Sequence, residues 1–295
     1  EGRLDIPDTE ASALALRRHA GRTHVLAIGD HDAPLAVGVY DPDAGDGLGG
    51  LRDWQRHDLG GLDGWARAPG GSQFEAIACD AIGTVVLMRE DPAELVVVDA
   101  PAGRVRSRLD LVVPAWSALA GKWDDPASRG EGLVLLRGGR VLVAKEKKPR
   151  ALVEFGPPGT SPRGVGLDDL LGPDEGWEVP AEVTRLHALA VWPLKKDAKA
   201  TLGDISALAC DGDSLWMLSD KSEALAGMAL TGSLVRGGGP VRTLDRVVRL
   251  PKAAVKPEGV VRLDAERVLV ALDTPRPRDN GLLLRVGSAQ RGENA

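Results

Sequence analysis

Short apolar runs separated by polar turns recur along the chain, and four stretches share one order of positions. In each stretch an acidic residue opens an apolar run, a turn containing Gly or Asp follows, and a second apolar run ends at another acidic residue. The two acids lie 15 or 16 residues apart. The stretches run from Glu75 to Glu90, from Glu131 to Glu146, from Asp204 to Asp220 and from Glu258 to Asp273. Such self-similarity predicts a repeat fold.

A fainter fifth copy lies near the N-terminus. Its residues Glu10-Ala-Ser-Ala-Leu-Ala parallel Asp204-Ile-Ser-Ala-Leu-Ala, and its closing acid is Asp30. The predicted repeat units therefore start near residues 10, 75, 131, 204 and 258.

The apolar runs are short, rich in Val, Leu, Ile and Ala, and bounded by Gly, Asp and Pro, which is typical of strands. Successive opening acids lie 54 to 73 residues apart, and each interval has room for four strands with their connections. Four-stranded sheets repeated around an axis form a β-propeller. We therefore predict an all-β fold, with residues 1–295 forming one β-propeller of four-stranded antiparallel blades. Five blades are the first choice, and six are the alternative if a long interval contains a degenerate blade.

Further strands complete this scheme. Outer strands are predicted within 104–111, 182–192 and 241–250. Because only 37 residues follow Glu258, we expect residues from the N-terminus to complete the last blade and so remove a free sheet edge. The Gly- and Pro-rich segment 156–177 is either a lid over one mouth of the ring or a plain insertion.

The paired acids carry the chemistry of the repeat. Gly138-Gly139 resembles a two-residue hairpin turn, which would place Glu131 directly opposite Glu146 at the open end of the hairpin. Equivalent hairpin ends gather at one mouth of a propeller, so the sequence predicts an acidic mouth. Its carboxylates are Glu75, Glu90, Glu131, Glu146, Asp204, Asp220, Glu258 and Asp273, and its basic neighbours are Arg89, Lys145, Lys147 and Lys221.

Opposed carboxylates destabilise a sheet unless something compensates for their charge. The basic neighbours, backbone N–H groups of adjacent blades and a bound divalent cation are three ways to do so. For a cation, calcium is the first guess, with Glu75, Glu131, Asp204 and Glu258 as ligands, because hard divalent ions prefer carboxylate oxygens. Three roles remain open for these carboxylates: they hold neighbouring blades together, they bind a cation or a cationic ligand, or they take part in catalysis.

Composition and charge argue against some classes of binding partner. The net charge of −6 argues against nucleic acid, and the absence of a long apolar stretch argues against a membrane span. We expect a soluble protein and a monomer. No export signal is visible, and the localisation stays open. The two cysteines, Cys79 and Cys210, occupy similar places in AIACD and ALACD and are interpreted as small buried thiols rather than zinc ligands.

Several motifs resemble the SdiA-regulated propeller proteins and the related propellers labelled esterase-like or phytase-like. They are Glu-Gly-Leu at Glu131, Pro-Glu-Gly-Val at Pro257, LVAKE ending at Glu146, and Asp204-Ile-Ser followed by LWMLSDKS ending at Ser222. The resemblance extends from Phe74 to Asp273. It implies a β-propeller with acidic residues near the central channel, and it lends weak support to calcium or phosphoester chemistry.

Three functions follow as hypotheses. The first is a binding propeller whose acidic mouth holds a divalent cation or another small ligand. The second is a metal-dependent hydrolase acting on a phosphoester or a lactone-like ester, in which a bound ion would activate water. The third is a scaffold that docks another protein by its rim loops. The sequence names no substrate and no catalytic residue.

Overall fold

The structure is a computed structural model of the chain, and it describes residues 2–7, 11–29, 35–44, 49–63, 65, 74–125, 128–252, 254–274 and 278–286. Glu10 and Asp30, the two acids of the predicted fifth copy, lie outside the described residues. Strands dominate the described part of the chain, as the short apolar runs predict.

Three sheets contain four strands each. The first sheet joins β2 (Ala11–His19), β3 (Arg22–Gly29), β4 (Leu35–Asp41) and β5 (Gly50–His57). The second joins β14 (Ala207–Asp211), β15 (Ser214–Ser219), β16 (Ala224–Ala229) and β17 (Arg246–Arg249). The third joins β18 (Pro257–Arg262), β19 (Arg267–Leu272), β20 (Gly281–Arg285) and β1 (Gly2–Leu4).

The fourth sheet has eight strands and consists of two antiparallel four-stranded halves. One half is β6 (Phe74–Cys79), β7 (Thr84–Arg89), β8 (Glu94–Asp99) and β9 (Arg104–Val112). The other is β10 (Gly130–Leu136), β11 (Arg140–Lys145), β12 (Ala151–Gly156) and β13 (Arg185–Pro193). The outermost strands β9 and β13 pair in parallel, with Leu111 opposite Leu186. The described sheets therefore number four, which differs from the five predicted.

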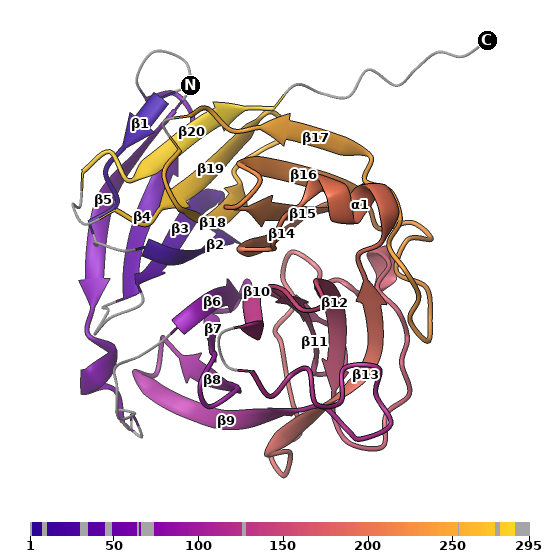
Figure 1. The fold of residues 1–295 in the computed structure, drawn as a ribbon. Helices are drawn as coiled ribbons and strands as arrows, with labels where there is room; N and C mark the ends of the chain where they lie inside the picture. Colours follow the sequence, from indigo (N-terminus) through magenta and orange to yellow (C-terminus); the bar gives the residue numbers. More distant parts are fainter. Residues whose placement is uncertain are drawn as a thin grey trace.

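The sheets are arranged radially around a central axis (Figure 1). The innermost strands contact one another in the order β2, β6, β10, β14, β18 and back to β2. The architecture is thus an all-β propeller. The N-terminal strand β1 pairs with β20 near the other end of the chain, with Arg3 opposite Leu282, as expected for closure by N-terminal residues.

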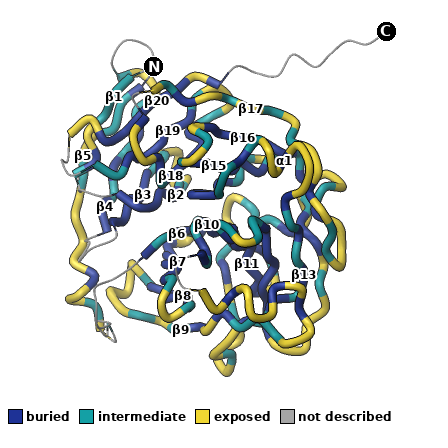
Figure 2. The backbone as a smooth tube through the Cα atoms, in the orientation of Figure 1, coloured by how far each residue is buried: buried dark blue, intermediate teal, exposed yellow. Residues whose placement is uncertain are grey.

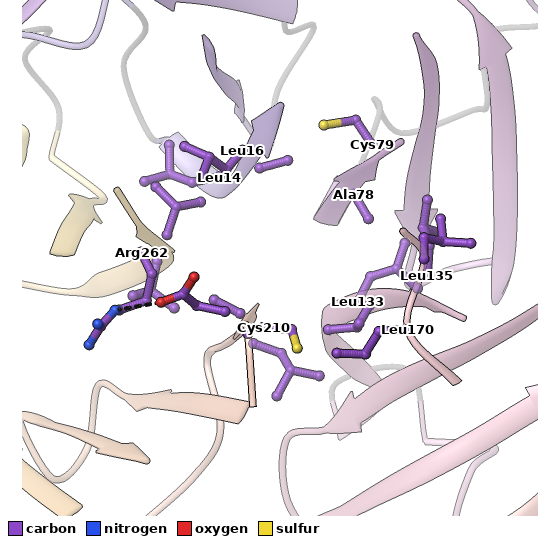
Figure 3. Close-up of a pocket in the computed structure, with 18 of the residues that line it drawn as sticks. Leu14, Leu16, Ala78, Cys79, Leu133, Leu135, Leu170, Cys210 and Arg262 are labelled. Atoms are coloured by element: carbon purple, nitrogen blue, oxygen red, sulfur yellow. Dashed lines mark ion pairs between the residues drawn. The ribbon is translucent and has the colours of Figure 1, made fainter. Parts of the chain in front are cut away.

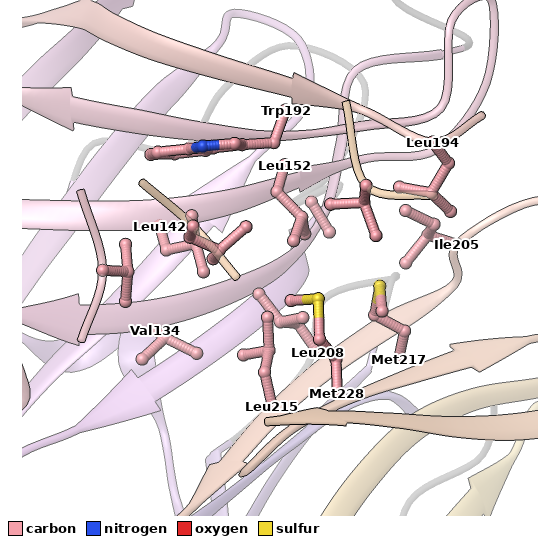
Figure 4. Packing of buried hydrophobic residues seen from close by; sticks show 14 of the residues in the cluster. Val134, Leu142, Leu152, Trp192, Leu194, Ile205, Leu208, Leu215, Met217 and Met228 are labelled. Carbon is pink, nitrogen blue, oxygen red and sulfur yellow. The ribbon is translucent and has the colours of Figure 1, made fainter. Parts of the chain in front are cut away.

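The hydrophobic core lies between the faces of neighbouring sheets. Figure 4 shows one such interface, where Leu142 and Trp192 of the β10–β13 half of the eight-stranded sheet face Leu215 and Met217 of the β14–β17 sheet. Strands buried on both faces read as continuous apolar runs, and every residue of β11 is buried. Exposed residues are concentrated on loops and outer strands (Figure 2).

Helices are few and short in the described residues. They are two 3₁₀ turns, η1 (Leu59–Gly61) and η3 (Leu167–Asp169), and one α-helix, α1 (Lys196–Thr201). None of the described helices has the length and apolar character needed to cross a membrane. The turn η3 belongs to the long connection between β12 and β13, which contains the predicted segment 156–177 except for Gly156, the last residue of β12.

The hairpin between β10 and β11 differs from the prediction. Leu136 pairs with Arg140, so three residues form the turn instead of two. The register also shifts between Gly130 and Gly132, which leaves Glu131 as the extra residue of a β-bulge. As a result Glu146 faces Arg129, whose carbonyl accepts a hydrogen bond from the Glu146 backbone N–H at 2.9 Å. Glu131 and Glu146 are therefore not directly opposed.

Candidate functional site: an acidic cavity at one mouth

A cavity of about 220 Å³ opens at the end of the ring where the innermost strands begin. It is lined by Ser12, Glu75, Glu131, Glu146, Asp204, Ser206, Asp220, Lys256, Glu258 and Asp273. Every predicted mouth carboxylate except Glu90 is in this lining. The structure thus brings together residues that lie up to about 200 positions apart in the sequence.

The bulges explain how the opening acids reach the cavity. Register shifts between Phe74 and Ala76, between Gly130 and Gly132, and between Pro257 and Gly259 make Glu75, Glu131 and Glu258 the extra residues of their strands. The shift in β2 places Ser12 at the same position. A bulge turns one side chain away from the regular alternation, and all four of these residues line the cavity.

The prediction for the copy that begins at Asp204 needs a correction. Matching the apolar positions, Ser206-Ala207-Leu208 corresponds to Glu75-Ala76-Ile77, so Ser206 rather than Asp204 is the equivalent of the bulged glutamates. The Ser206 hydroxyl donates to the carbonyl of Pro257 at 2.8 Å. Asp204 precedes the strand and accepts a hydrogen bond from Ser219 Oγ at 2.6 Å. The innermost ring therefore combines three glutamates with two serines, and alignment on apolar positions instead of acids would have found both serines.

Glu131 and Glu258 are the least compensated carboxylates of the cavity. Within the described part of the chain, neither side chain accepts a hydrogen bond or forms an ion pair. Burial, reinforced by the charges of Glu75, Glu258, Glu90 and Glu146, raises the pKa of Glu131 well above its usual range. Burial also raises the pKa of Glu258 to about 8, against the opposing effect of Lys256. Glu258 therefore carries a proton at neutral pH unless positive charge arrives, and the pKa of Glu131 is shifted in the same direction.

The closing acids have more partners. Asp273 forms an ion pair with Lys256, and Glu146 forms one with Lys147 at 2.6 Å. Glu90 accepts a hydrogen bond from the backbone N–H of Arg129 in the next sheet half at 3.1 Å. Burial nevertheless raises the pKa of Glu90, and burial and Asp204 raise that of Asp220. Two lysines and the backbone N–H of Arg129 thus compensate the carboxylates of the rim more than those of the centre.

Three predicted basic neighbours have other roles. Arg89 pairs with Glu94 at 2.5 Å and lies over the Phe74 ring, and the buried Lys145 ammonium donates to Ser128 and to the carbonyl of Lys147. Lys221 contributes its backbone N–H to Asp204 at 3.2 Å. None of the three lines the cavity. Lys256, which sequence reasoning missed, does line it, and its position two residues before Glu258 was the available signal.

The geometry does not match a preformed chelation site. Among the described residues, no group of three or more His, Cys, Asp or Glu side chains converges closely enough to hold a metal ion. Glu75, Glu131, Asp204 and Glu258 line the same cavity but do not form such a group. What the arrangement offers is a volume of concentrated negative potential, larger than one bare ion requires.

Comparisons with known proteins add no function. No protein-family model matches the chain, and no curated protein does. Among solved structures, Myxococcus xanthus glutaminyl cyclase gives a TM-score of 0.49 at 12% identity, covering 97% of this chain and 96% of that chain. Virginiamycin B lyase from Staphylococcus aureus gives 0.38 at 8% identity, covering 98% and 74%. A luciferin-regenerating enzyme gives 0.44 at 12% identity, covering 94% and 78%. Likenesses this low say nothing about the activity of this chain.

Proposed function

We propose that this protein is a five-bladed β-propeller that binds a small cationic ligand in its acidic cavity. The blade count rests on the closed order of the innermost strands and on treating the eight-stranded sheet as two blades joined by their outer edges. The ligand proposal rests on one observation above all. Glu131 and Glu258 lie among other carboxylates with raised pKa values and no partner within the described residues.

The shared chemistry of the ligand is positive charge, which a hydrated divalent ion such as calcium or a small organic amine can supply. A cation in the cavity would stabilise the ionised forms of Glu131 and Glu258, so binding would release protons. Affinity should therefore rise as the pH increases toward the pKa of Glu258, about 8.

The first experiment is a thermal melt of chelator-treated protein at pH 8, with millimolar calcium, magnesium, manganese or zinc in one set and ethylamine or 1,3-diaminopropane in another. A ligand at about 100 times its dissociation constant stabilises the folded state by roughly 2.7 kcal/mol. We expect at least one cation to raise the melting temperature and the gain to shrink at pH 6. The two sets distinguish a metal from an amine.

Glu131→Gln and Glu258→Gln should each reduce the stabilisation by the cation. Glu266→Gln is the matched control, because Glu266 is exposed on the hairpin at the opposite end of the same sheet. No rise for any cation, or equal rises in all three variants, would contradict the proposal. Metal-dependent hydrolysis, a protein-docking role and membership of the SdiA-regulated family stay predictions, without an observation in the structure that favours them.

A further inference from the structure

A second, larger cavity of about 630 Å³ occupies the other end of the central axis. Each innermost strand contributes an apolar side chain to it: Leu14, Ile77, Leu133, Leu208 and Val260. These residues lie two positions beyond the bulged residues of the acidic cavity, so the same strands line both sites. Figure 3 shows Leu14, Leu16, Ala78, Leu133 and Cys210 arranged around the open space. Its volume suits a small organic ligand, and its exposed wall combines apolar and polar atoms in about equal parts.

Part of the predicted lid segment borders this cavity. Leu167, Leu170 and Leu171 line it from the connection between β12 and β13. The segment is anchored by the buried Arg140, which pairs with Glu154 at 2.6 Å and with Asp169 at 2.5 Å. The anchored segment keeps Leu167 at the cavity although its side chain is 47% exposed. An apolar ligand would remove this exposed surface from water.

The charged side chains that line the cavity are Arg18, Asp211, Asp213 and Arg262. Asp211 faces Arg262, whose Nε lies 3.3 Å from Asp211 Oδ2 and whose guanidinium lies over the Trp216 ring. Arg18 is different, because its side chain is 55% exposed and lies 3.9 Å from Asp211. Its Nη2 donates to the carbonyls of Arg262 and Leu263. Within the described residues, its Nε and Nη1 donate no hydrogen bond and remain available to a ligand.

We propose that this cavity binds a small apolar carboxylate, such as a medium-chain fatty acid or an aromatic acid. The apolar body would contact Leu133, Leu208 and Leu167, and the carboxylate would accept a hydrogen bond from Nε or Nη1 of Arg18. Because Nη2 is already engaged, this contact is a single charge-assisted hydrogen bond, which gives it both energy and direction. This site is independent of the acidic cavity, whose charge would repel the same ligand.

Calorimetric titration of the intact protein with decanoate and with decanol tests the proposal. We expect saturable decanoate binding that weakens about tenfold in Arg18→Gln, while decanol binding stays unchanged in that variant. Leu167→Asp should weaken binding of both. Arg56→Gln and Val247→Asp are the matched controls, because both residues are exposed on outer strands away from the cavity.

The two cysteines provide a second measurement of binding that does not rely on calorimetry. Cys79 and Cys210 both line the cavity and are the only cysteines of the chain. Bound decanoate should slow their modification by methyl methanethiosulfonate, and Arg18→Gln should remove that protection at the same decanoate concentration. Absence of saturable binding, unchanged decanoate affinity in Arg18→Gln, or thiols that react equally fast with and without ligand would each overturn the proposal.

Discussion

At the scale of single residues, the surroundings of a carboxylate, rather than its position in the repeat, determine whether its charge is compensated. Asp273 and Glu258 line one cavity, yet Asp273 has an ion pair with Lys256 whereas Glu258 has no ion pair or hydrogen bond within the described residues. The acidic motif predicted that carboxylates would gather. It could not predict which of them would remain uncompensated, since that depends on side chains brought in from neighbouring sheets.

The raised pKa of Glu258 makes the stability of the protein depend on pH. Between its ordinary pKa near 4.5 and about 8, the folded state keeps a proton that the unfolded chain has released. The free energy of unfolding therefore falls as the pH rises through this window, and this loss levels off above about pH 8. Glu258→Gln stays neutral throughout and escapes the loss.

We therefore expect Glu258→Gln to gain stability over the unmodified protein as the pH rises from 5 to 8.5, by about 4 kcal/mol. Urea unfolding at pH 5, 7 and 8.5, without added cations, measures this change. Glu266→Gln, whose side chain is exposed, should show no such trend. A Glu258→Gln curve parallel to that of the unmodified protein would mean that Glu258 titrates normally.

At the scale of elements, the apolar runs predicted strands well because alternation and turn residues are local signals. The outer strands β9 and β13 lie close to the predicted ranges 104–111 and 182–192. The bulges were not predicted, since one extra residue leaves the apolar run unbroken. The prediction therefore placed Glu131 opposite Glu146. It also assigned Asp204 to the position in the repeat that Ser206 occupies. The glycines beside two bulges, Gly132 and Gly259, were the remaining signal.

Gly132 allows adjacent innermost strands to approach closely. A Cβ at this position would collide with Leu208 Cβ and lie 2.7 Å from the backbone nitrogen of Leu208. Because backbone cannot move aside cheaply, we expect Gly132→Ala to lower the free energy of unfolding by about 1–3 kcal/mol in urea denaturation. The control is Gly61→Ala, where the nearest atom, Asp58 Oδ2, would lie 3.7 Å away. A Gly132→Ala variant as stable as the control would show that the inner strands separate easily.

At the scale of the whole molecule, the two mouths of the ring differ in chemistry although the same strands form both. One cavity is lined mainly by carboxylates, and the other combines apolar side chains with both acidic and basic ones, Arg18 among them. Both require the ring to be closed, because every innermost strand, or the residue just before it, contributes to each. Closure depends on residues near the N-terminus, because strand β1 pairs with β20 of the β18–β20 sheet.

Asn280 stabilises the closure of the ring by binding the N-terminal segment. Its fully buried side chain accepts a hydrogen bond from the Ile6 backbone N–H at 2.7 Å and donates one to the Ile6 carbonyl at 3.0 Å. Asn280→Asp keeps the shape but replaces the donor with an oxygen that faces a carbonyl. We expect a loss of about 1–3 kcal/mol in the free energy of unfolding, since a buried acceptor loses its donor. Gln55→Glu, an equal change on an exposed strand, is the control. If closure supports both sites, Asn280→Asp should weaken cation and decanoate binding together, whereas loss of only one would show that the mouths are held independently.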